Sequence, residues 1–167
     1  EVERQIEVNI ELGSLFRDRL QIEFDEAQDG RLGRAWRTYY KDALNLLDVA
    51  ERDARAAQLW QHVLDAQVNQ ARVHFYANNT ASAEEILVAI DNTVMELLDD
   101  TYQKHLIGEE QAGWPTAPHL RDTNWVFRQM STAQRIRGQI AFRRFEERVA
   151  VLKKADPRST SQYRAQD

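Results

Sequence analysis

The fold of this chain is decided by residues 34–76, RAWRTYYKDALNLLDVAERDARAAQLWQHVLDAQVNQARVHFY. The stretch contains neither glycine nor proline, and its apolar residues recur at alternating intervals of three and four, interrupted only by Gln61. This spacing is typical of a helix whose apolar seam packs along another helix. We therefore predict one long helix over about residues 34–77, which would be roughly 65 Å long at 1.5 Å per residue.

Two further helices are predicted after this stretch. The run Asn78–Thr80 is a stop signal, and Ser82 with Glu85 three residues later forms a capping box. We expect a helix over residues 83–107, which should lie antiparallel to the long helix because the connection is so short. A last helix is expected over residues 119–154, after a linker rich in glycine and proline.

The first 29 residues allow two interpretations. Polar and apolar residues alternate over 5–12 and again over 20–25, which is the pattern of a half-buried strand. A β-hairpin turning through Gly13 and Ser14 would fit it. The abundant Glu, Arg, Gln and Leu residues instead favour a helix. Both remain open at this point, with the helix slightly favoured.

The composition fits one folded domain. The chain has 167 residues, of which 43% are hydrophobic and 29% charged, so it can bury a core. We predict an all-α domain over residues 1–155, an elongated bundle of three to four helices built on the long one. A polar, flexible tail should follow over residues 156–167. The longest apolar run, Ile86–Ile90, is far shorter than the roughly 20 residues that cross a bilayer, so we expect no membrane span.

The predicted helices differ in length, and this leaves apolar surface to be covered. The helix over 83–107 can cover only the second half of the long helix, whereas the first half is the more apolar. Either residues 1–29 fold back over it, or a second protomer or another protein covers part of it. The candidate interface residues are Trp36, Tyr39, Tyr40, Leu44 and Leu47, together with Trp114 in the linker.

Charge is distributed unevenly. The formal net charge is −5, yet residues 128–154 carry eight bases and only two acids. After Gly138 the apolar stripe of the last helix shifts around its axis, and Arg137, Arg144 and Arg148 continue the line of the earlier stripe. These arginines would pair with the acidic helix over 83–107, or bind a small anion or an acidic partner, since guanidinium groups suit carboxylates and phosphates.

Catalytic and metal-binding motifs are missing from the sequence. There are no cysteines, and the four histidines show neither His-Glu-x-x-His nor Glu-x-x-His spacing. No serine lies in a nucleophile elbow, and no glycine-rich phosphate loop occurs. We therefore expect no catalytic residue, no metal and no cofactor. The acidic overall charge also argues against nucleic-acid binding.

One short motif resembles a known family. Arg55 lies seven residues before His62, which resembles the Arg-x4-6-His signature of HEPN-type ribonucleases, themselves small helical bundles. The resemblance covers these two residues and implies an RNA-cleaving site. The sequence departs from the family pattern at Ala56, where a polar residue usually follows the arginine.

From these patterns we predict a non-catalytic helical module for interaction or oligomerisation, which self-associates or docks on a partner protein through an apolar helix face. The first alternative is a ligand-sensing helical bundle, the soluble part of a receptor, that binds a small anion through the arginines of the last helix. The second alternative is a HEPN-like ribonuclease. The compartment is left open, with the cytoplasm slightly favoured.

Overall fold

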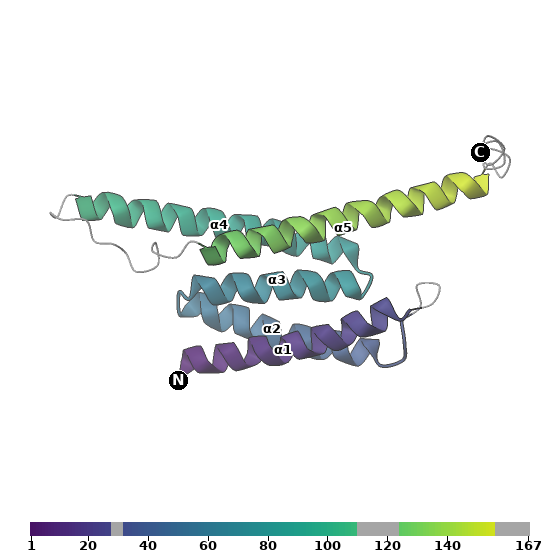
Figure 1. Ribbon diagram of the computed structural model, residues 1–167. Coiled ribbons are helices and arrows are strands. Elements are labelled where there is room, and N and C mark those ends of the chain that lie inside the picture. The colour runs from purple at the N-terminus through teal and green to yellow at the C-terminus, as the bar shows by residue number, and fades with distance from the viewer. Residues whose placement is uncertain (28–31, 110–123, 156–167) are drawn as a thin grey trace.

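The computed structural model describes residues 1–27, 32–109 and 124–155, and the side chains of these residues except 98–109, 124 and 155. Within these ranges the chain forms helices and no strand, which confirms the all-α prediction (Figure 1). The helices are α1 (Val2–Asp25), α2 (Trp36–Ala56), α3 (Trp60–Tyr76), α4 (Thr80–Glu109) and α5 (Asn124–Ala155). None of the described helices is long and apolar enough to cross a membrane.

The N-terminal residues form the single helix α1, so the β-hairpin interpretation is wrong and the helical one is confirmed. The alternating pattern arises because α1 carries two apolar faces. Ile6, Gly13 and Leu20, spaced seven apart, are buried against the other helices. Leu12 and Leu15 belong to a second face that is exposed. Along the sequence, the apolar residues of these two helical faces together alternate with polar residues, which is the period-two pattern of a strand.

The predicted long helix over 34–77 is wrong, because it is broken into α2 and α3. Gln58 adopts a left-handed conformation with φ of 56°. The Leu59 N–H donates to the Ala54 carbonyl at 2.9 Å, and the Gln58 N–H donates to the Arg55 carbonyl at 3.0 Å. These two hydrogen bonds form a Schellman motif, which ends α2 and reverses the chain.

The same motif recurs at the end of α3. Asn78 has φ of 61°, and the Asn79 N–H donates to the His74 carbonyl at 2.9 Å. The Asn79 side-chain oxygen then accepts from the Ser82 N–H at 3.3 Å, so Asn79 caps α4. The predicted capping box at Ser82 is therefore wrong, and α4 begins at Thr80.

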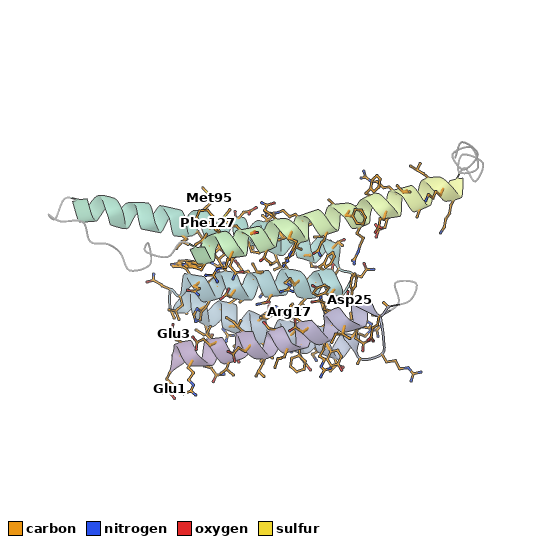
Figure 2. All side chains as sticks on the ribbon, viewed as in Figure 1. Glu1, Glu3, Arg17, Asp25, Met95 and Phe127 are labelled. Carbon is orange, nitrogen blue, oxygen red and sulfur yellow. The ribbon has the colours of Figure 1, made fainter. Side chains whose placement is uncertain are left out.

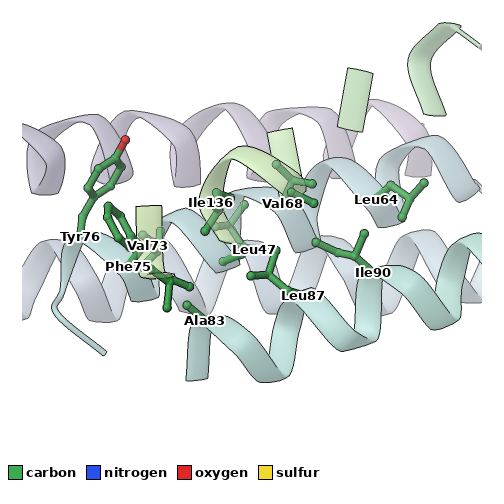
Figure 3. Close-up of a cluster of buried hydrophobic side chains, with 14 of the residues drawn as sticks. Leu47, Leu64, Val68, Val73, Phe75, Tyr76, Ala83, Leu87, Ile90 and Ile136 are labelled. Carbon is green, nitrogen blue, oxygen red and sulfur yellow. The ribbon is translucent and has the colours of Figure 1, made fainter. Parts of the chain in front are cut away.

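Helix α3 lies at the centre and contacts the other four helices, with α1 and α2 on one side and α4 and α5 on the other (Figure 1). Ten of its 17 residues are buried, so it has almost no solvent face. Figure 3 shows the core between these layers, where Val68 of α3 lies among Leu47, Leu87 and Ile136. The described residues thus form five helices, whereas three to four were predicted.

Helix α1 covers the first half of α2, the surface that the sequence left without an assigned neighbour. The two helices approach closely at Gly13. A Cβ at Gly13 would lie 2.8 Å from Leu47 Cγ and 3.4 Å from the Ala43 carbonyl oxygen. Gly13 therefore serves close helix packing. The predicted tail over residues 156–167 lies outside the described residues.

Gly13 and Gly138, each inside a helix, give a matched test of this close approach. We expect Gly13→Ala to destabilise the fold by roughly 1–2 kcal/mol, because overpacking against Leu47 outweighs the gain in helix propensity. Gly138→Ala in α5 should stabilise it by up to about 1 kcal/mol, since a Cβ there meets nothing within 4 Å. Urea unfolding measures both changes. Equal stabilisation by the two substitutions would contradict the close packing at Gly13.

The reversal at Gln58 makes a second prediction. Gln58→Gly should raise the free energy of unfolding by about 0.5–1 kcal/mol, because glycine adopts positive φ without strain. Lys41→Gly, at an exposed position inside α2, should lower it by a similar amount. If both substitutions destabilise the protein equally in urea unfolding, α2 and α3 are one continuous helix in solution.

Candidate interaction surface

Helix α5 is buried along its first half and exposed along its second. Ala133, Ile136 and Ile140 are buried in the core formed with α3 and α4. The C-terminal end of α5 continues past the ends of the neighbouring helices (Figure 1). Phe142 and Leu152 in this part are 62% and 67% exposed. The end of α5 therefore presents large apolar side chains to solvent.

These side chains share one face, which we name the α5 stripe: Phe142, Phe145, Val149 and Leu152. They are spaced three, four and three residues apart, so they align along a helix. Phe145 follows the buried Ile136 by nine residues, which is a rotation of about 180° at 3.6 residues per turn. The stripe therefore faces away from the core, and Figure 2 shows side chains projecting outward from this end of α5.

Two of the three predicted arginines form ion pairs with α4. Arg137 contacts Asp91 at 2.6 Å and also donates to the Leu87 carbonyl at 2.9 Å, whereas Arg144 contacts Glu84 at 2.5 Å. Pairs in this order require antiparallel helices, as the charge pattern suggested. Both pairs are partly exposed, so each contributes at most about 1 kcal/mol.

Arg148 differs from the other two arginines. It is exposed and has no ion pair with the part of the chain that the structure describes. Together with Arg144, Glu147, Val151 and Leu152 it lines a shallow groove beside the α5 stripe. This part of α5 therefore combines apolar and cationic side chains on adjacent faces.

Arg143 was missed in the sequence, although it fixes α5 to the rest of the fold. Its guanidinium group lies over the rings of Phe24 and Phe75, 4.7 and 4.5 Å from their centroids, and donates to Asn78 Oδ1 at 2.8 Å. Burial lowers the pKa of Arg143. The available signal was its position seven residues after Ile136, on the core-facing side of α5.

The predicted interface residues of α2 lie mostly inside the fold. Leu47 has no exposed surface, and Trp36, Tyr39, Tyr40 and Leu44 are half-buried against the core. Leu47 therefore offers no surface to a partner in this fold. Trp114 lies outside the described residues.

Tyr39 also borders a second apolar surface, which the sequence reading missed. This surface, the α1 groove, is lined by Leu12, Leu15, Phe16, Asp18, Arg19, Ile22 and Tyr39. Its volume is about 500 Å³. The exposed residues Leu12, Leu15 and Ile22 follow the three-four spacing of an apolar seam, with Arg19 at the intervening position.

The residues of the ribonuclease-like motif have separate surroundings. Arg55 donates to Thr93 Oγ1 at 2.9 Å and pairs with Glu51 and Glu96, which ties α2 to α4. His62 instead lies beside two carboxylates of α1. The two residues thus have no partner in common among those that the structure describes.

A buried histidine links α2 to α3. His74 Nδ1 and the Tyr40 hydroxyl are 3.0 Å apart in a hydrogen bond. Burial lowers the pKa of His74 below its ordinary value of about 6.5, and the attraction of Glu85 opposes this change only in part. Folding therefore disfavours the protonated form of His74.

Comparisons with known proteins give no relative. The chain matches no protein-family model, and no curated protein sequence or solved structure is significantly similar to it. Its function must therefore be inferred from the surfaces described above.

His74 predicts a pH dependence of stability. Because its pKa is lower in the folded state than in the unfolded state, the unfolded chain takes up a proton first as the pH falls below about 6.5. The free energy of unfolding should therefore drop between pH 7 and pH 5, and His74→Gln should reduce that drop. Urea unfolding at several pH values measures it. If the free energy of unfolding depends on pH in the same way in His74→Gln as in the wild type, His74 has the same pKa in the folded and unfolded states.

Proposed function

We propose that this chain is a non-catalytic helical module that self-associates through the α5 stripe. The observation that carries the proposal is the exposure of Phe142, Phe145 and Leu152, each 62–67%, on a face directed away from the core. Contiguous exposed apolar surface of this kind marks interaction sites in proteins. Burying one such side chain contributes about 1.5–3 kcal/mol, so the stripe can support association.

Charge complementarity supports a second copy of the chain as the partner. Residues 128–154 carry a net charge of +6, and residues 81–112 carry −7. Helices α4 and α5 extend beyond α3 at opposite ends of the molecule (Figure 1). Head-to-tail packing would therefore bring the basic end of α5 in one copy to the acidic end of α4 in the next. The antiparallel pairs of Arg137 and Arg144 with α4 show that the two helices are complementary within one chain.

The same contacts weaken the alternative of a small-anion sensor. Arg137 and Arg144 already contact carboxylates, so an anion would have to displace Asp91 and Glu84. Of the three predicted arginines, Arg148 is the one without a carboxylate partner among the described residues. A single exposed arginine is a weak anion site. Self-association through the α5 stripe explains more of the surface of α5 than anion binding does, because it also accounts for the exposed apolar side chains.

Analytical ultracentrifugation with light scattering over a range of concentrations tests this proposal. We expect the wild type to associate reversibly, and Phe142→Ser with Phe145→Ser to weaken association at least about tenfold through loss of apolar burial. Because both phenylalanines are exposed, the double variant should keep its helical content and its unfolding midpoint, which circular dichroism checks.

Leu15→Ser is the matched control, because Leu15 is 61% exposed but lies in the α1 groove. It should leave association unchanged. Weakening by Leu15→Ser alone would place the interface on α1 and overturn the role of the α5 stripe. A wild type that stays monomeric at every concentration would overturn self-association itself.

A further inference from the structure

Two helices bring three metal-ligating side chains together at one end of the fold. Glu3 and Glu7 are one turn apart on α1, and His62 lies in the first turn of α3. One ligand atom from each residue can be chosen so that all lie within 4.8 Å of one another. Figure 2 shows Glu3 near the N-terminal end of α1. We propose that these residues bind a divalent transition-metal ion, with Zn²⁺ as the best match.

The distances fit a shared ion better than direct hydrogen bonds. His62 Nε2 lies 3.7 Å from Glu7 Oε1 and 3.9 Å from Glu3 Oε1, both too long for a hydrogen bond. Zinc holds nitrogen and oxygen ligands at about 2.0–2.2 Å, so in a tetrahedral site neighbouring ligand atoms are about 3.4 Å apart. A rotation of the exposed glutamate side chains closes the difference.

The imidazole of His62 gives an independent indication. Its side chain is only 14% exposed, and both ring nitrogens are buried without a hydrogen-bond partner among the described residues. A buried ring nitrogen without a partner is unfavourable, and such groups usually have a protein, water or ion partner. An ion bound at Nε2 would satisfy that atom and neutralise the two glutamates.

A third carboxylate lies close to this cluster. Asp65 follows His62 by three residues on α3 and accepts a hydrogen bond from Gln129 of α5. Acidic groups around a metal-binding histidine commonly support its orientation and basicity. Asp65 therefore places a third carboxyl group near the proposed site, three residues from its histidine.

The donor set decides which cation is preferred. An imidazole with two carboxylates suits Zn²⁺ and similar transition metals, whereas Mg²⁺ prefers oxygen ligands and retains its water. Three protein ligands leave one position for water or another ligand. No sequence motif indicates this site, because its ligands come from positions 3, 7 and 62 on two different helices.

Binding should be tested with the untagged full chain, freed of metal by chelation and titrated with ZnCl₂. We expect calorimetry to give one Zn²⁺ per chain. At about a hundredfold excess of free Zn²⁺ over Kd, Tm should rise by roughly 5–10 °C, because the ion joins α1 to α3 only in the folded state. MgCl₂ at the same concentration should produce little change.

Isosteric variants separate the site from folding effects. Glu3→Gln with Glu7→Gln retains size and helix, and it should abolish both the heat of Zn²⁺ binding and the rise in Tm. His62→Ala should do the same in calorimetry, which requires only that the variant is folded. Glu11→Gln, the next exposed glutamate along α1, should bind as the wild type does. Retained Zn²⁺ binding in the Glu3/Glu7 variant, or an equal response to Mg²⁺, would overturn the site.

Discussion

The fold depends on two reversals of the chain, one at each end of α3. Both are made by a residue held in the left-handed conformation, Gln58 before α3 and Asn78 after it. These turns place α2 and α4 against opposite sides of α3 and let α1 and α5 complete its enclosure. The reversals are short, so the apolar faces of three successive helices are brought together with little loop to order. All the remaining packing is built around the helix between them.

A central helix enclosed in this way has to pair its buried side-chain N–H groups, although the side-chain oxygens of Gln67 and Gln70 have no hydrogen-bond partner among the described residues. Gln67 and Gln70 are almost fully buried on α3, and their side-chain amides donate to carboxylates of α2, Gln67 to Glu51 and Gln70 to both Asp48 and Glu51. Glu51 also accepts from Arg55, which reaches Thr93 of α4. This network connects three helices and fixes their register, because displacement of one helix would leave buried polar groups unpaired.

The sequence predicted the helical class and offered the pairing of the arginines of α5 with the acidic residues of α4, because periodicity and charge report these directly. Its failures have physical causes. Gln58 carries no sign of positive φ, and the three-four spacing resumes in register after the break with only Gln61 interrupting it, so the two helices were predicted as one. Asn78 was recognised as a stop because asparagine adopts that conformation readily. The Glu3, Glu7 and His62 cluster and the contacts of Arg143 depend on which helices meet, and no local pattern encodes that. The stripe after Gly138 was visible, but only the structure shows that it faces solvent.

The continuity of α5 has a consequence for its own stability. A helix segment of about a dozen residues is marginal by itself in water, and the part beyond Arg144 gains little from tertiary packing. The exposed part of α5 therefore stays helical largely because it continues the buried half, and the backbone hydrogen bonds run through one unbroken helix. Local opening should begin at the C-terminal end and stop where Arg143 and Ile140 hold the helix to the core. A protein that binds the exposed half would thus bind those molecules in which the last turns are helical. The free energy needed to order these turns would weaken its binding.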